Sequence, residues 1–426
     1  MTKTVRLAGA LLLLFSAACG ANTNAGSTPA VAPGPRPVPA PTPDEEAKLA
    51  AAVEKLVAHD RANDWTPVVC AEVARAFEAI GTNAQALYNA ALAYQRCADE
   101  PRAKARLESA LKIDPSLHHA RAQLALYQYK ADGDADRAIA ALSDAVTAAR
   151  FQNVPALVDL ATVQMARGGP RGGEGCKDDL DCAKLNLQRA LAIDDAHMPA
   201  KNQLALYYLK LAERRAGKGK KANVQELELA ALVCAQAIAR DPSYAPIHNT
   251  AGLVHMALGQ VNGAVAEFGA ARKLDARFFE AHMNYAAVNL GFRGFAQAEA
   301  AYRAAVALRP NDYDAHLGLA LALRGPLTGN EPDYARRLDA VQGELDAAKK
   351  IDPNRPDAYF NEGILRQEFL TKTGAPKSES IASLERARKS FESFLDRAKG
   401  KAEYKDAVTR GDERIKEIDA AIAFLK

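Results

Sequence analysis

Aromatic side chains and net charge are both scarce in this chain. Phe, Tyr and Trp make up 6% of its 426 residues, and only one residue is Trp. Lys and Arg number 55 against 52 Asp and Glu, which gives a formal net charge of +3. Proteins that bind nucleic acid through its phosphates need clustered Lys and Arg. This balance argues against a nucleic-acid partner.

Motifs of the common enzyme classes are absent. The sequence contains no H-E-x-x-H and no G-x-S-x-G, and "AGKGKK" lacks both the upstream glycine and the following Ser or Thr of a phosphate-binding loop. Six histidines lie near no such motif, and we interpret them as packing residues: His118, His119, His248, His255, His282 and His316. We therefore predict no catalytic residue, no metal site and no cofactor.

Long apolar runs are also missing, apart from a short one near the start. Lys3 and Arg6 flank the beginning of an apolar stretch over 7–15, which is well below the roughly 20 residues that span a bilayer. Small residues at 16–18 then precede Cys19. This order is typical of a secretion signal.

The same segment resembles a bacterial lipoprotein signal, in which the cysteine is lipidated and becomes the first residue. The resemblance implies a leader over 1–18 and acyl chains, palmitate among them, on Cys19. Gly20 in place of Asp implies the outer membrane, with the protein facing the periplasm. The alternative is ordinary cleavage nearby, which would leave Cys19 as an exposed thiol.

A proline-rich stretch over 19–43 follows the leader. It contains prolines at 29, 33, 35, 37, 39, 41 and 43, and few residues that could form a core. Such composition favours extended polyproline II and no packed structure. Fully drawn out, this tether could hold a domain on the order of 70 Å from its anchor.

From Asp44 onward the sequence repeats itself. Ala237, Ala271 and Ala305 follow one another at 34 residues, the period of a helix–turn–helix repeat. Gly252 stands at a small site in a first helix, where we expect two backbones to approach closely. A stripe along the second helix recurs as Ala264, Phe268 and Ala271, then as Ala298, Tyr302 and Ala305, and Pro242 and Pro310 close their units.

These features resemble the tetratricopeptide repeat, and the resemblance covers 44–397. It implies an all-α fold, a right-handed α-solenoid of about nine helix pairs whose first pair, 44–81, is degenerate. We expect 398–426 to form a capping helix, because a stack of repeats needs its last face covered. Where the spacing exceeds 34, the excess lies in the loops "GGPRGGEGCKDD", "RRAGKGKKANVQ" and "GPLTGNEPD".

The cysteines other than Cys19 suggest two disulfides. Cys176 and Cys182 flank "KDDLD" in one loop, and Cys70 and Cys97 fall on helices that should be neighbours. An oxidising periplasm permits both bonds, and no second Cys or His pair stands at zinc spacing. Cys234 occupies a large-residue site of a second helix and is interpreted as a buried thiol.

A row of amides on the first helices is the candidate binding site, since first helices line the concave face in this family. The row and its preceding neighbours comprise Asn89, Gln123, Gln203, Thr250, Asn284 and Asn361 with Tyr88, Asn202, Asn249, Met283 and Phe360. Amides can hydrogen-bond an extended peptide, with aromatic or Met neighbours adding apolar contact. The alternative is that the amides bond between adjacent helices and hold the stack in register.

One basic cluster lies in an inserted loop, at Arg214, Arg215, Lys218, Lys220 and Lys221. It is either a patch for acidic lipid, cell-wall polymer or an acidic partner, or a solvated loop, and we favour the loop.

Together these features predict a lipid-anchored periplasmic scaffold that binds proteins in a cell-envelope assembly of motility, pilus or cell-wall machinery. The insertions and Ala/Arg-rich composition resemble those of lipoproteins in the gliding-motility complex of myxobacteria. The alternative function is a periplasmic carrier or sensor that binds cell-wall fragments or lipid in the solenoid groove.

Overall fold

The structure is a computed structural model that describes residues 42–426, except 63, 174, 217–222 and 371–375. The predicted leader, Cys19 and nearly all of the tether lie outside the described residues. Packing divides the described chain near residue 237 into an N-terminal unit and a C-terminal unit. Each unit is considered by itself.

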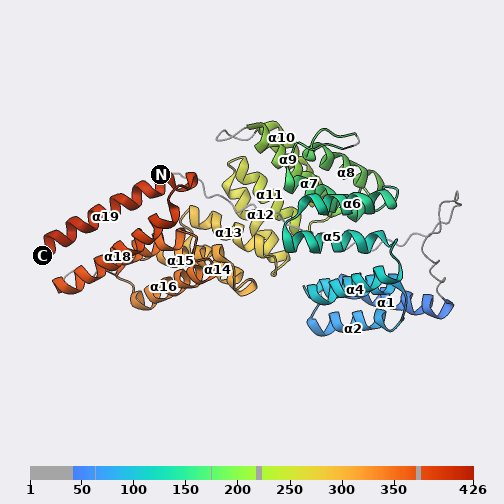
Figure 1. Cartoon of the computed structure of the whole chain (residues 1–426), viewed down its shortest axis with the longest axis horizontal. Coiled ribbons are helices and arrows are strands. Elements are labelled where there is room, and N and C mark those ends of the chain that lie inside the picture. Colours follow the sequence, from blue (N-terminus) through green and yellow to red (C-terminus); the bar gives the residue numbers. More distant parts are fainter. Residues whose placement is uncertain (1–41, 63, 174, 217–222, 371–375) are drawn as a thin grey trace. The chain divides into compact units, whose positions relative to one another are not determined.

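The described part of the N-terminal unit consists of helices joined by short turns and loops (Figure 1). They are α1 (Pro43–Ala62), α2 (Pro67–Glu78), α3 (Ala84–Arg96), α4 (Glu100–Ile113), α5 (His118–Asp132), α6 (Ala135–Ala148), α7 (Val154–Arg167), α8 (Asp179–Ile193), α9 (Met198–Ala216) and α10 (Val224–Arg240), of which the last runs across the division.

The C-terminal unit is likewise helical wherever it is described with regular structure. Its elements are α11 (Ala245–Ala257), α12 (Val261–Leu274), α13 (Phe279–Gly291), α14 (Phe295–Leu308), α15 (Tyr313–Arg324), α16 (Tyr334–Ile351), α17 (Asp357–Ile364), the π-helix η1 (Leu365–Phe369), α18 (Lys377–Ala398), the 3₁₀-helix η2 (Ala402–Tyr404) and α19 (Lys405–Leu425).

Helices pack as consecutive pairs within each unit. In the N-terminal unit α3 packs on α4, α5 on α6 and α7 on α8, and in the C-terminal unit α11 packs on α12, α13 on α14 and α15 on α16. First helices of successive pairs are also in contact: α5 contacts α7, and α11 contacts α13. The predicted fold class, an all-α stack of repeated helix pairs, is confirmed. No described helix is both long enough and apolar enough to cross a bilayer.

The turn between pairs is built by a recurring aspartate. In five turns an Asp Oδ1 accepts a hydrogen bond from the backbone N–H two residues later: Asp114, Asp194, Asp241, Asp275 and Asp352. Aspartate makes this local bond readily, which stops the second helix and turns the chain toward the next first helix. The repeated aspartate therefore fixes where successive pairs are joined.

Gly252 sits at the close approach within its pair, but the neighbour is a ring and not a backbone. A Cβ added to Gly252 of α11 would lie 2.5 Å from Cε1 of Phe268 on α12. Gly363 of α17 meets Phe391 of α18 in the same way, at 2.7 Å. We expected two backbones to approach closely at Gly252, and the atoms nearest to an added Cβ there belong to the buried Phe268 ring.

The end of the chain differs in detail from the expected cap. The first helix α17 widens directly into η1, and α18 packs on both. The last helix, α19, begins at Lys405 and packs on α18, with Ile418 and Ile422 buried against Leu384 and Phe391.

Two glycine substitutions test the ring contact. We expect Gly252→Ala to lower the free energy of unfolding by about 1–3 kcal/mol, because the added methyl overpacks against Phe268. Gly343 on α16 is exposed with nothing within 4 Å of an added Cβ, so Gly343→Ala should raise it by about 0.5–1 kcal/mol through helix propensity. Denaturant unfolding curves measure the free energy of unfolding of both variants. Equal changes in that free energy would contradict the contact between Gly252 and the Phe268 ring.

Candidate protein-binding face

The amide row lies on the first helices as predicted, but most of it is buried. Gln123, Asn202, Gln203, Asn249 and Thr250 are each at most 3% exposed, and Asn284 is 9% exposed. A side chain so covered cannot touch a bound peptide unless the helices move.

Three of the buried amides take part in hydrogen bonds between neighbouring first helices. Asn284 Nδ2 on α13 donates to Asn249 Oδ1 on α11 at 2.9 Å. Gln95 Nε2 on α3 donates to Gln123 Oε1 on α5 at 3.1 Å. These bonds favour the alternative in which the amides hold the stack in register, because each joins one repeat to the next.

Five residues of the row keep partly exposed side chains: Tyr88, Asn89, Met283, Phe360 and Asn361. The Tyr88 ring is tilted against His119 with centroids 5.8 Å apart, and Asn89 accepts a weak bond from Gln85 at 3.4 Å. Phe360 packs edge-on against Phe391 and Phe394, and Asn361 Oδ1 accepts from Arg324 at 3.1 Å. These five residues are the members of the row that a partner could reach.

A hollow of about 480 Å³ adjoins Phe360 in the C-terminal unit. It is lined by Phe360 and Ile364 of α17 and by Arg410, Glu413, Arg414 and Glu417 of α19. Its floor is apolar and its α19 wall carries two charges of each sign. This is the hollow that a residue of the predicted row helps to form.

One member of the row was missed by the sequence analysis. Asp159 on α7 stands between Gln123 and Gln203 in the order of repeats, and is 4% exposed. Burial raises its pKa to about 8, and its Oδ2 has no hydrogen-bond partner among the described residues. Its position within the apolar run "ALVDLATV" was the available signal. Every residue from Ala156 to Met165 on α7 is buried, so this carboxyl is held neutral inside the stack.

Three histidines at equivalent positions, 34 residues apart, tie the turn before each first helix to that helix. Nε2 of His248, His282 and His316 lies 3.0, 3.0 and 2.9 Å from the carbonyl oxygens of Pro242, Ala276 and Pro310. They are buried packing residues, as interpreted. Among the described residues, no group of three or more His, Cys, Asp and Glu is arranged to hold a metal ion.

Second helices supply a further partner to two of these rings. His248 Nδ1 lies 2.7 Å from Glu267, and His316 Nδ1 lies 2.6 Å from Glu344. Ala301 holds the matching place on α14, and Nδ1 of His282 is buried with no hydrogen-bond partner in the part of the chain that the structure describes. Burial correspondingly lowers the pKa of His282.

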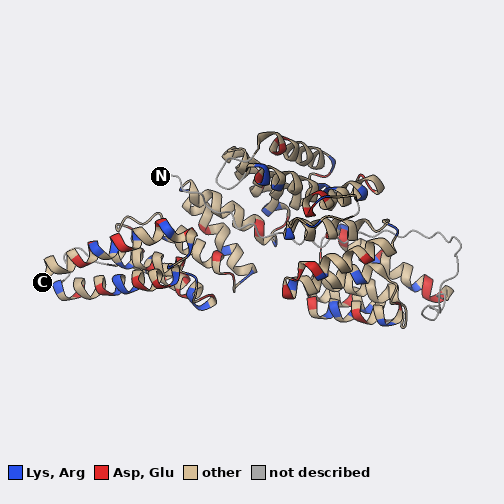
Figure 2. Cartoon of the chain, turned by 45° about the horizontal axis from the view of Figure 1, so that its top comes forward, with Lys and Arg blue, Asp and Glu red and all other residues tan. Residues whose placement is uncertain are grey.

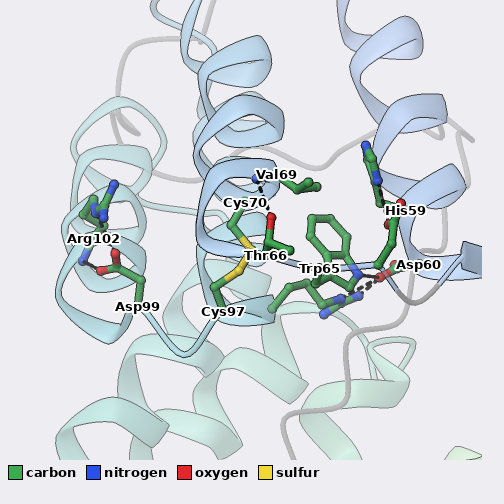
Figure 3. The surroundings of a disulfide bond; sticks show 11 residues. His59, Asp60, Trp65, Thr66, Val69, Cys70, Cys97, Asp99 and Arg102 are labelled. Atoms are coloured by element: carbon green, nitrogen blue, oxygen red, sulfur yellow. Dashed lines mark hydrogen bonds and ion pairs between the residues drawn. A yellow bond between two sulfur atoms is a disulfide. The ribbon is translucent and has the colours of Figure 1, made fainter.

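Both cysteine pairs named from the sequence are bonded, Cys70 to Cys97 and Cys176 to Cys182, and Cys234 is a buried thiol. Figure 3 shows Cys70–Cys97 joining α2 to the end of α3, beside the Asp99–Arg102 ion pair. Nearby, Asp60 accepts hydrogen bonds from the single Trp, Trp65, and from Arg96. The degenerate first pair is thus attached to the second by a covalent bond and a shared carboxylate.

The basic cluster is partly neutralised. Arg214 pairs with Asp178 at 2.9 Å, and Arg215 pairs with the buried Glu226. Lys218, Lys220 and Lys221 lie outside the described residues. The two arginines act within the chain, which fits the favoured interpretation of a loop.

The buried carboxyl predicts a pH dependence. Folding raises the pKa of Asp159 from 3.8 to about 8, so the native chain binds more protons between those values and its stability falls as pH rises through them. We expect Asp159→Asn to raise the melting temperature at pH 8 much more than at pH 4. The exposed Asp144→Asn on α6 is the control. Parallel pH profiles for wild type and Asp159→Asn would contradict the assignment.

The amide pair predicts a loss of stability. Asn249→Ala or Asn284→Ala should cost about 1 kcal/mol by removing a buried hydrogen bond, and more where the remaining amide is left unpaired. Circular dichroism melts of both single variants and the double variant form a cycle, in which the double should cost less than the sum. Strictly additive costs would show that the pair contributes no coupling.

Comparisons with known proteins find similar solved structures of tetratricopeptide repeat proteins but no matching family model. No protein-family model matches the chain, and no curated protein does. A solved thermophilic TPR protein of Thermus thermophilus is 26% identical, with 48% of this chain and 98% of that chain covered and a TM-score of 0.41. A tetratricopeptide repeat protein of Parabacteroides merdae is 15% identical, with 71% and 99% covered and a TM-score of 0.38. YrrB, a TPR protein described as having an unusual peptide-binding site, is 15% identical, with 52% and 97% covered and a TM-score of 0.34.

Proposed function

We propose that this protein is a lipid-anchored periplasmic scaffold that binds other proteins in an assembly of the cell envelope. The observation that carries the proposal is that the polar and aromatic side chains along the first helices fall into two groups, one buried and one partly exposed. The buried amides join one repeat to the next, as in the Asn249–Asn284 bond. Tyr88, Asn89, Met283, Phe360 and Asn361 keep partly exposed surface, and Phe360 lines a hollow. Mixed aromatic and amide surface suits contact with a peptide or a protein loop.

Sequence outside the described residues supports the location. The leader, Cys19 and the proline-rich tether form the order expected of an anchored envelope protein. Two disulfides within the described chain fit an oxidising compartment. Among envelope processes, the loop insertions and the Ala/Arg-rich composition favour a motility complex of the gliding type.

Cross-linking in cells tests the binding face. A photo-reactive residue at Gln85, exposed on the first helix α3, should capture a protein partner, whereas one at Lys104, exposed on the second helix α4, should not. Capture only from Lys104 would contradict the assignment of the face. If neither position captures protein, native mass spectrometry that finds a cell-wall fragment or lipid bound would establish the carrier function instead.

Fractionation tests the anchor. Cys19→Ala should move the protein from the membrane to the soluble periplasm, because the acyl chains supply the membrane affinity. A matched Cys234→Ala variant, which alters a buried thiol, should stay with the membrane. Membrane association that persists for Cys19→Ala after partner binding is removed by high salt would contradict anchoring through Cys19.

A further inference from the structure

The exposed side of α19 carries a stripe of charges that is complementary to itself. Arg410, Glu413, Arg414 and Glu417 follow the spacing i, i+3, i+4, i+7, so they share one side of the helix, and all four line the same hollow. Figure 2 shows both signs of charge along the C-terminal helices. When the order of the four residues is reversed, each Arg takes the position of a Glu and each Glu takes the position of an Arg.

Two of the four charges have no ion pair within the described residues. Arg410 and Glu413 are exposed and unpaired there. Arg414 pairs with Glu368 at 2.7 Å. Among the described residues, the contacts of Glu417 are long, with Arg414 at 3.4 Å and with Gln367 at 3.5 Å. The stripe therefore retains capacity for partners outside its own chain, since one guanidinium has five N–H donors.

Apolar surface continues along the same side of α19. Ala420 is exposed and Phe424 is 87% exposed, one and two turns beyond Glu417. Phe424 is among the few large apolar side chains left in the open. A partner that covers this side must offer charges of both signs opposite the stripe and apolar surface opposite its end.

We propose that this side of α19 binds a second copy of the chain, with the two α19 helices antiparallel about a two-fold axis between residues 413 and 414. Arg410 then faces Glu417 of the second copy, and Glu413 faces its Arg414. Parallel pairing would set Arg against Arg and Glu against Glu, which is repulsive. Because the contact is isologous, it uses up the same patch on both copies and stops at a dimer.

The apolar end fits the same arrangement. With the axis between 413 and 414, Ala420 lies opposite Ala407 of the second copy, and Phe424 reaches the start of that copy's α19. A helix of 21 residues is about 31 Å long, so one helix pair forms an interface at the small end of the specific range. We expect the dimer to dissociate at roughly micromolar concentration.

Charge reversal with rescue tests the pairing. Sedimentation equilibrium is measured on the full chain carrying Cys19→Ala, which prevents lipidation. Arg410→Glu alone and Glu417→Arg alone should each weaken the dimer at least tenfold, because each places two like-charge pairs across the axis. An equimolar mixture of the two variants should dimerise as the parent does, since every facing pair in the mixed dimer is again opposite in charge.

The control is Asp412→Arg, an exposed charge on α19 that does not line the hollow, and it should leave dimerisation unchanged. Circular dichroism melts confirm that all variants fold. A parent chain that stays monomeric to about 100 μM, well above the dissociation constant expected, would overturn the proposal. So would single reversals that dimerise as the parent does, or a mixture no better than either variant alone.

Discussion

The aromatic ring of a second helix lying on a glycine of a first helix is the contact on which the C-terminal unit depends. Phe268 on Gly252 and Phe391 on Gly363 bring paired helices to a separation at which no larger residue fits. Tyr302 instead lies on Gly318 of the following first helix, 2.3 Å from an added Cβ. The same kind of contact thus forms pairs and also joins one pair to the next. Aspartate turns and histidine-to-carbonyl bonds then set how the next pair begins.

Close packing of neighbouring helices also buries polar groups on the first helices of both units. The Asn249–Asn284 bond satisfies two amides that would otherwise be orphaned between helices. Asp159 meets the same constraint differently, by remaining protonated. The surface of the row left for a partner is therefore at Tyr88 and Asn89 in one unit and at Met283, Phe360 and Asn361 in the other.

Periodicity made the fold predictable, because a 34-residue repeat with an aromatic and two alanines at set places allows few other packings. The Cys70–Cys97 pair followed from the same repeat, whereas Cys176–Cys182 followed from the short spacing of the two cysteines. The repeat pattern predicted that only a small residue fits at Gly252, but it did not predict that the neighbouring atoms belong to the Phe268 ring. Burial of Gln123 and Asn202 was likewise beyond the sequence, since rotation of each first helix decides whether an amide faces a neighbour or solvent. The π-helix η1, which packs against α18, was not predicted from the sequence.

Hydrogen–deuterium exchange across the full chain tests most directly the claim that polar and aromatic contacts between first and second helices hold each unit. Backbone amides in α7, buried from Ala156 to Met165, and in α12 around Phe268 should exchange most slowly. Those in α1, where only Ala52 and Leu56 are buried, should exchange fastest among the described helices. Exchange in α7 as fast as in α1 would contradict the account.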